Sequence, residues 1–213
     1  MARPKASDYD EKRVSILSKA ASLIAERGYA GASLSLIAKE CDFSKSLTYH
    51  YYPDKDSLLF DIIFCHLNEL AETVEEAAAR AKSPRRKLEA MAIALLEAYR
   101  DHDAEHDVQI SSLKLLSPDR QGVLKNIERR LVRMFSAVIA ELLPSGANSD
   151  DLLKPLTMSL FGMLNWHYLW FKEGKGMERA DYARLACRLV VDGSRKVTAS
   201  PPIKPRPEDV VPG

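Results

Sequence analysis

Residues 33–55, SLSLIAKECDFSKSLTYHYYPDK, decide the fold of this chain. Apolar residues at helical spacing lead up to Cys41, and a second short helical segment starts at Ser44 and ends before Pro53. Ser44 can cap the second segment, because its hydroxyl can accept a hydrogen bond from a backbone N–H two or three residues further on. Pro53 ends the segment, since the residue before a proline avoids the helical region. Two short helices joined by a tight turn form a helix-turn-helix unit.

The second helix of this unit carries side chains suited to contact with DNA. Its hydroxyl groups, rings and cation are too polar for a buried helix and too aromatic for an ordinary solvated one. Such groups recognise phosphates and base edges, and the first residues of this helix usually face the bases. The predicted base contacts are Lys45, Ser46, Leu47, Tyr49 and His50. From these residues alone, the alternative is a solvated corner of an all-α enzyme.

From about Tyr9 to Leu59 the chain resembles the DNA-binding domain of the tetracycline-repressor (TetR) family. The resemblance is carried, in order and without gaps, by Ser33, Ile37-Ala38, Asp42-Phe43-Ser44-Lys45, Tyr49-His50-Tyr51-Tyr52 and Pro53-Asp54-Lys55-Asp56-Ser57-Leu58. It implies that Tyr51 and Lys55 hold backbone phosphates, with Ser33 at the N-terminus of the second helix of the domain. It also implies three helices in a DNA-binding head and six in a larger body.

Two positions depart from the family pattern. Asp42 stands where the family usually has Gly in the turn, and we expect it to adopt the left-handed conformation, which Asp tolerates better than most residues. Leu47-Thr48 stands where Thr-Leu is more common. The order of this pair leaves open which of the two side chains packs inward.

The composition indicates a protein with a substantial core and no membrane span. The 213 residues are 46% hydrophobic and 29% charged, which is ordinary for a globular protein. The longest apolar stretch, 156–171, contains Asn165 and His167 and is shorter than the roughly 20 residues that a membrane span needs. Three scattered cysteines and the lack of an N-terminal signal pattern predict a cytoplasmic protein. Because the net charge is only +1, any positive surface for DNA must be local.

Helical periodicity dominates and strand signals are nearly absent, so we predict an all-α fold. The head, 1–54, begins with a helix over 10–27 that Gly28 stops. The body, 55–198, is predicted to contain helices over 55–82, 84–101, 105–116, 118–143, 149–172 and 178–197. The Pro-rich tail, 199–213, is predicted to be disordered, because it cannot bury apolar surface.

The stretch from Leu156 to Phe171 predicts a homodimer. Its apolar side chains fall on nearly every side of a helix, which is typical of a helix buried all round. A body of this size achieves such burial most easily if one face meets the same helix of a second protomer. The family resemblance implies the same arrangement, with the last two long helices of each protomer in a four-helix bundle. A purely intramolecular core is the alternative.

Polar and aromatic residues of the body predict an effector cavity, because ligand pockets are mostly apolar with a few placed polar groups. The predicted lining residues are Tyr99, His102, Gln109, Phe161, Asn165, Trp166 and Trp170. The segment 161–177 also resembles TetR-family regulators that respond to acyl-CoA thioesters, which implies an acyl- or aryl-CoA effector. Its phosphates need cations, and the basic runs at 85–87 and 129–133 are the candidates.

Together these features predict a ligand-responsive transcriptional repressor. It binds a palindromic double-stranded DNA operator and is released by a small hydrophobic effector, with no resident cofactor or metal. One alternative is a metal-dependent helical enzyme, because His102, Glu105 and His106 spell an inverted zinc-peptidase motif. This stretch is polar and has no obvious third ligand. The other alternative is a helical protein-interaction module whose head has lost DNA binding.

Overall fold

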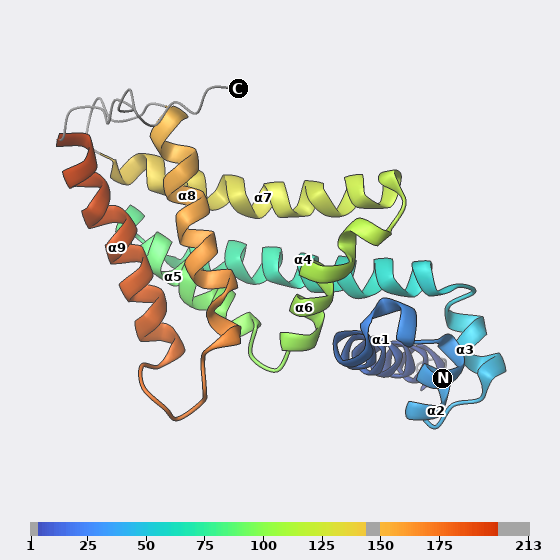
Figure 1. The fold of residues 1–213 in the computed structure, drawn as a ribbon. Helices are drawn as coiled ribbons and strands as arrows, with labels where there is room; N and C mark the ends of the chain where they lie inside the picture. Colours follow the sequence, from blue (N-terminus) through green and yellow to red (C-terminus); the bar gives the residue numbers. More distant parts are fainter. Residues whose placement is uncertain (1–3, 144–149, 200–213) are drawn as a thin grey trace, which may run out of the picture.

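The computed structural model describes residues 4–143 and 150–199, and these residues are mostly helical (Figure 1). The α-helices in the two ranges are α1 (Pro4–Gly31), α2 (Leu34–Glu40), α3 (Lys45–Tyr51), α4 (Lys55–Arg80), α5 (Pro84–Ala98), α6 (Asp103–Ser112), α7 (Pro118–Leu142), α8 (Asp150–Asn165) and α9 (Arg179–Ala199). Two short 3-10 helices, η1 (Leu113–Leu115) and η2 (His167–Leu169), follow α6 and α8. Within the described residues the predicted all-α fold, with three head helices and six body helices, is confirmed.

The helix-turn-helix unit forms where the sequence predicts it. The hydroxyl of Ser33 accepts a hydrogen bond from the backbone N–H of Leu36, and the hydroxyl of Ser44 accepts one from the N–H of Leu47. These bonds cap α2 and α3 at their first turns. Asp42, in the turn between them, has φ 56°, the expected left-handed conformation.

Helix α1 starts earlier than predicted and kinks at the predicted stop. Gly28 has φ 71° and ψ 162° inside the span Pro4–Gly31, a conformation that residues with a Cβ atom rarely adopt. The chain then makes a further turn before α2. Gly28 therefore redirects the backbone between the long part of α1 and the helix-turn-helix unit.

Helix α4 runs from the head into the body (Figure 1). Asp54 caps it by accepting a hydrogen bond from the backbone N–H of Ser57. Leu58, near its start, lies in the apolar core around the head, and Leu70 and Val74, near its end, lie in the core of the body. Helix α4 therefore belongs to the cores of both the head and the body.

The head is also packed against other body elements. Val108 of α6, Leu113 of η1 and Leu124 of α7 belong to the same buried cluster as the head residues. The predicted boundary between 54 and 55 falls inside this shared packing. The division into domains stays a prediction.

Helix α8 ends at Asn165, well before the predicted end at 172. The carbonyl oxygen of Asn165 accepts a hydrogen bond from His106 Nε2 at 3.1 Å. Its side-chain oxygen accepts one from the Tyr99 hydroxyl at 2.9 Å. A continuing α-helix would bond that carbonyl to the N–H four residues later, and in the structure it accepts from His106 instead. The prediction of a single helix over 149–172 is therefore wrong beyond Asn165.

The remaining boundaries differ from the predicted ones by a few residues. Helix α5 ends at Ala98, and α6 begins at Asp103. The predicted tail, 199–213, lies outside the described residues except for Ala199, which ends α9. Among the helices described, none combines the length and the apolar character needed to cross a bilayer.

Candidate DNA-binding surface and effector cavity

Helix α3 turns one polar face to solvent and the opposite face to the head. The solvent face consists of Lys45, Ser46, Tyr49 and His50, with Leu47 half-buried beside them. Thr48 is fully buried on the opposite face, and its hydroxyl donates to the Ser44 carbonyl at 3.4 Å. Of the Leu47-Thr48 pair, the threonine therefore packs inward. All five residues predicted to contact bases remain accessible at least in part.

A partly buried ion pair and a tyrosine fasten α3 to the rest of the head. The Tyr52 hydroxyl donates to Asp61 Oδ2 at 3.1 Å, and the same oxygen accepts from Arg13 Nη2 at 2.7 Å. Burial, together with the Asp61 charge, raises the pKa of the Tyr52 phenol, so the hydroxyl stays protonated and able to donate. The recognition helix is thus tied to both α1 and α4.

The three residues that the family resemblance assigns to phosphates have different surroundings. Ser33 is exposed, and the Tyr51 ring stacks on the Tyr9 ring at 4.5 Å between centroids. Lys55 Nζ donates to the Tyr29 carbonyl at 2.6 Å and lies 4.1 Å from the centre of the Tyr29 ring. Lys55 therefore already holds the start of α4 against the end of α1. Phosphate contact by these residues stays a prediction.

A cavity of about 230 Å³ lies among α4, α5, α6, α7 and α8, and we call it the effector cavity. Four of the predicted ligand residues line it: Tyr99, Gln109, Phe161 and Asn165. The other lining residues are Leu67, Leu70, Leu95, Glu128, Leu131, Val132 and Met158. The lining is mainly apolar with a few polar groups, as is usual for sites that bind small molecules.

The polar groups of the effector cavity are partly satisfied by one another. The Tyr99 hydroxyl donates to Asn165 Oδ1 at 2.9 Å, and Gln109 Nε2 donates to Glu128 Oε1 at 2.9 Å. Gln109 Oε1 is buried and has no hydrogen-bond partner in the described chain. A buried acceptor without a partner is costly, so this oxygen is a point where a ligand donor can bind. No sequence signal marked Glu128, because a glutamate on an amphipathic helix is usually solvated.

The other three predicted ligand residues lie outside the effector cavity. Trp166 and Trp170 are 52% and 55% exposed, because α8 ends before them. His102 lines a second cavity of about 260 Å³, where α1 of the head meets α4 and the start of α6. The positions of Trp166, Trp170 and His102 therefore do not support direct contact with a ligand in the effector cavity.

Histidine rings gather where the head meets the body. The His66 ring lies 5.9 Å from that of His106 and 6.3 Å from that of His102, between centroids. Burial, then the charges of His106 and His102, lower the pKa of His66 from 6.5 to about 3. Burial also lowers the pKa of His106. Both rings are therefore neutral at physiological pH.

The zinc-peptidase motif does not form a metal site in the described part of the chain. His106 Nε2 is bonded to the Asn165 carbonyl, and His102 Nδ1 lies 3.7 Å from Glu105 Oε2. Among the residues described, no group of three or more His, Cys, Asp or Glu is arranged to hold a metal ion. The metal-enzyme alternative therefore has no support.

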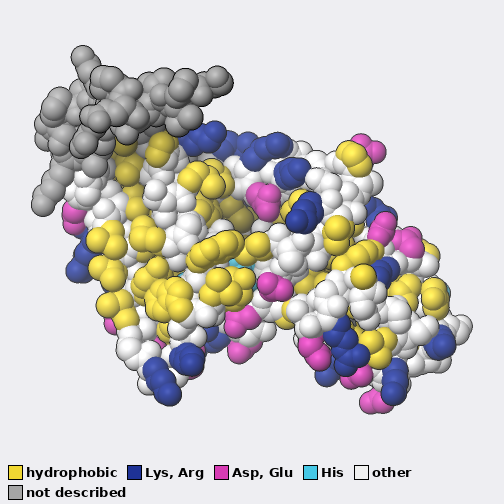
Figure 2. Space-filling model, viewed as in Figure 1, with side chains coloured by type: hydrophobic (Ala, Val, Ile, Leu, Met, Phe, Trp, Pro, Cys, Tyr) yellow, Lys and Arg dark blue, Asp and Glu magenta, His cyan; other side chains and the backbone are white. Residues whose placement is uncertain are grey.

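Helices α8 and α9 expose apolar surface on one side of the body (Figure 2). Met158 of α8 and Leu185 and Leu189 of α9 are exposed, and Leu189 is exposed by 57%. Other residues of the same helices, such as Phe161 and Val190, are buried in the body core. Apolar surface that gathers on one face of a molecule usually marks a protein–protein contact.

A helix-turn-helix head with a polar, aromatic recognition helix, joined to an all-α body with a cavity, defines a DNA-binding transcriptional regulator. More specifically, the chain belongs to the tetracycline-repressor (TetR) family. Residues 16–62 match "Bacterial regulatory proteins, tetR family", and residues 81–194 match "Tetracyclin repressor-like, C-terminal domain". The predicted family is confirmed.

Individual relatives agree with this assignment. The chain is 28% identical over 167 residues to the HTH-type transcriptional regulator HbdR of Aromatoleum sp. (strain CIB), covering 76% of this chain and 69% of that protein. The crystal structure of a TetR-family regulator from Bordetella parapertussis 12822 has a TM-score of 0.79 and 29% identity, over 84% of this chain and 94% of that one. AibR in complex with isovaleryl coenzyme A and operator DNA has a TM-score of 0.73 and 23% identity, over 84% of this chain and 98% of that one. The likeness to AibR shows the fold alone.

Proposed function

We propose that this protein is a homodimeric repressor that binds a palindromic DNA operator through α3 and leaves it when a small hydrophobic effector enters the body. The observation that carries the proposal is that α3 is exposed on one face and anchored on the other. Lys45, Tyr49 and His50 face solvent, while Thr48 and Tyr52 anchor the opposite side. Groups that bind phosphates and base edges are thereby displayed on a firmly held helix.

A second protomer is part of the proposal. One head covers one half-site, and two heads must reach major grooves about 34–36 Å apart or a multiple of that spacing. The exposed apolar residues of α8 and α9 supply a surface for the two-fold contact. Because the proposed operator is DNA of the cell, the proposed location is the cytoplasm.

The proposed effector is an acyl-CoA thioester. The effector cavity, at about 230 Å³, suits a short acyl group and is too small for a whole coenzyme A, since sites for drug-sized ligands span about 300–1,000 Å³. The structurally similar AibR is described in complex with isovaleryl coenzyme A and operator DNA, which supports this class of effector. The acyl chain enters the cavity, and the nucleotide stays outside it.

Helix α4 is the proposed link between effector and DNA. Leu67 and Leu70 of α4 line the effector cavity, and Leu58 of the same helix lies in the core around the head. An effector that displaces α4 therefore alters the separation of the two heads. The loss of DNA affinity cannot exceed the difference in effector affinity between the two states.

The DNA-binding proposal is tested by selecting duplexes from a random library and measuring binding at several salt concentrations. Lys45→Ala and His50→Ala should change the selected sequence, because these side chains face the bases. Lys55→Ala should weaken binding to all sequences and lower the slope of log affinity against log salt by about one. Lys172→Ala, in the segment before α9, is the matched control and should behave as the native protein. A native protein that binds no duplex in a salt-sensitive way would contradict the proposal.

The effector proposal is tested with acyl- and aryl-CoA thioesters and their free acids. Binding by calorimetry and release of operator DNA are measured for each matched pair. The thioester should bind and release DNA, and the free acid should do much less. Equal responses to acid and thioester would remove coenzyme A from the proposal and leave only a hydrophobic acid.

A further inference from the structure

A buried arginine at the start of α9 makes only some of the hydrogen bonds that a buried charge requires. Arg179 is only 7% exposed, and its guanidinium lies 4.3 Å above the centre of the Phe171 ring. Its Nε and Nη1 atoms are buried and have no hydrogen-bond partner in the described chain. Buried charges are ordinarily paired and hydrogen-bonded. An arginine left in this state points to a partner that is not part of the protein.

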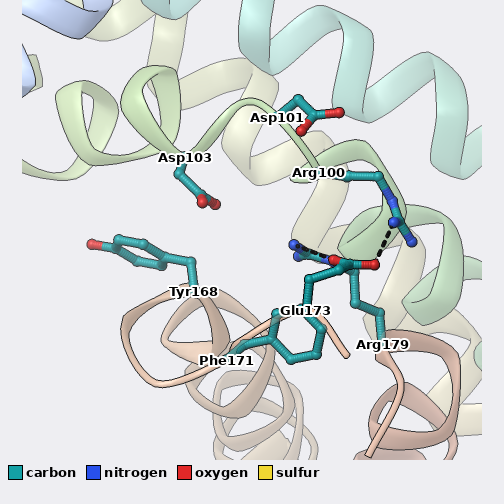
Figure 3. Close-up of a pocket in the computed structure, with 7 residues that line it drawn as sticks. All are labelled: Arg100, Asp101, Asp103, Tyr168, Phe171, Glu173 and Arg179. Carbon is teal, nitrogen blue, oxygen red and sulfur yellow. Dashed lines mark hydrogen bonds and ion pairs between the residues drawn. The ribbon is translucent and has the colours of Figure 1, made fainter. Parts of the chain in front are cut away.

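The one ion pair described for Arg179 is with a carboxylate that is half exposed. Glu173 Oε2 lies 3.6 Å from Arg179 Nη2, and Glu173 Oε1 accepts from Arg100 Nη1 at 2.6 Å. Figure 3 shows the Glu173 carboxylate between the two guanidinium groups. Glu173 itself is half exposed, and ion pairs with an exposed partner contribute little stability. Its carboxylate therefore occupies an anion position that it can leave at small cost.

These residues line a cavity of about 440 Å³ with Asp101, Asp103, Tyr168 and Phe171, and we call it the arginine pocket. Arg100 lies just after α5 and Arg179 begins α9, so two segments far apart in the chain present guanidinium groups to one space. A guanidinium group binds phosphate through two parallel N–H···O hydrogen bonds. Asp101 and Asp103 disfavour a purely anionic ligand. They favour one that also carries hydrogen-bond donors, as the base and sugar of a nucleotide do.

The arginine pocket is next to the effector cavity. Tyr99, which lines the effector cavity, precedes Arg100 in the chain, and Asn165 lies about one turn before Tyr168. The His106 ring fills the space between them, 4.1 Å from the Tyr99 ring and 5.2 Å from the Tyr168 ring between centroids. The two spaces are thus separated by the His106 ring, which an elongated ligand must pass to occupy both.

We propose that Arg100 and Arg179 bind the phosphate groups of a nucleotide-bearing ligand, and that Glu173 is the internal carboxylate this ligand displaces. This inference rests on the proposed function in one respect, since it places the nucleotide of the proposed CoA effector. It also replaces the basic runs at 85–87 and 129–133 as the phosphate site. Arg85 is paired with Asp192 and Arg130 with Glu75, on exposed helix surfaces.

The test uses free coenzyme A as the probe and pantetheine, which lacks the nucleotide, as the control ligand. Binding to the full-length protein is measured by calorimetry. Glu173→Gln should bind coenzyme A about tenfold more tightly than the native protein, which corresponds to one charge-assisted hydrogen bond. Arg179→Gln and Arg100→Gln should each lose at least that factor. Arg86→Gln, on the exposed surface of α5, should change nothing. The affinity for pantetheine should be the same in the native protein and in all four variants.

A purely structural ion-pair network makes the opposite prediction for Glu173. In that case Glu173→Gln lowers the melting temperature and does not tighten coenzyme A binding, which would overturn the proposal. Absence of coenzyme A binding to both native protein and Glu173→Gln would overturn it as well. Because Arg100 is exposed, Arg100→Gln keeps the test valid if Arg179→Gln does not fold. A negative result for the arginine pocket would not contradict DNA binding or thioester-dependent release, since those are measured separately.

Discussion

Lowering the pH from 7.5 to 5 should destabilise the protein, with His66 alone contributing about 2 kcal/mol to the loss. The ring is 4% exposed, its Nε2 atom has no partner in the described chain, and its pKa is lowered from 6.5 to about 3. A group whose pKa is lower in the folded than in the unfolded protein takes up its proton on unfolding. The free energy of unfolding therefore falls as the pH drops below 6.5, and this loss levels off only near pH 3.

The magnitude follows from proton binding to the unfolded chain. With a pKa of 6.5 in the unfolded state and about 3 in the folded state, the loss is roughly 0.8 kcal/mol at pH 6 and about 2 kcal/mol at pH 5. His167, whose pKa is lowered to about 4 by burial and by the Arg179 charge, acts in the same direction. The free energy of unfolding of the whole protein should therefore fall by more than the contribution of His66.

Urea unfolding at a series of pH values, at one fixed protein concentration because a dimer is expected, measures this loss. His66→Phe keeps a ring in the same space and removes the titrating nitrogen, so its loss between pH 7.5 and 5 should be smaller by about 2 kcal/mol. His50→Gln, on the exposed face of α3, should lose as much stability between pH 7.5 and 5 as the native protein does. If His66→Phe lost as much stability as the native protein, the assignment of a buried neutral imidazole would be refuted.

Two further predictions concern assembly and release. Leu189→Asp places a charge on the exposed apolar surface of α9 and should convert a micromolar dimer into monomers or insoluble protein, as sedimentation will show; a variant that remains a soluble dimer contradicts the proposed interface. Val132→Trp should fill a large part of the effector cavity and block the acyl chain, so the variant should bind operator as the native protein does but no longer respond to the thioester. Normal release from DNA would place the effector elsewhere.

The helix-turn-helix head was predictable from the sequence because its signals are local. The caps at Ser33 and Ser44, the left-handed Asp42 and the end imposed by Pro53 each depend on a few neighbouring residues. Gly28 marked the kink in α1 for the same reason. The family resemblance covers this same stretch, and the family is confirmed. The role of Lys55 was less accessible, because its bond to the Tyr29 carbonyl joins two separate helices.

The effector cavity was predictable only in part. Tyr99, Gln109, Phe161 and Asn165 were identified because polar and aromatic residues stood out in an apolar body, and all four line the cavity. Trp166 and Trp170 stood out equally, yet the end of α8 leaves them exposed. Periodicity shows that an apolar stretch can be helical, and it does not show where a tertiary contact will end the helix.

The all-α fold and the position of the recognition helix followed from the sequence alone, because these depend on local hydrogen bonds and on the spacing of apolar residues, and the family followed from the resemblance of the head. The tertiary structure decided which polar groups lose their contact with water. His106 reaches the Asn165 carbonyl, and Glu173 contacts both the buried Arg179 and Arg100, which lies far from both of them in the chain. Burial depends on how whole helices pack. Arg179, which no sequence pattern indicated, is for this reason the strongest candidate for binding a phosphate.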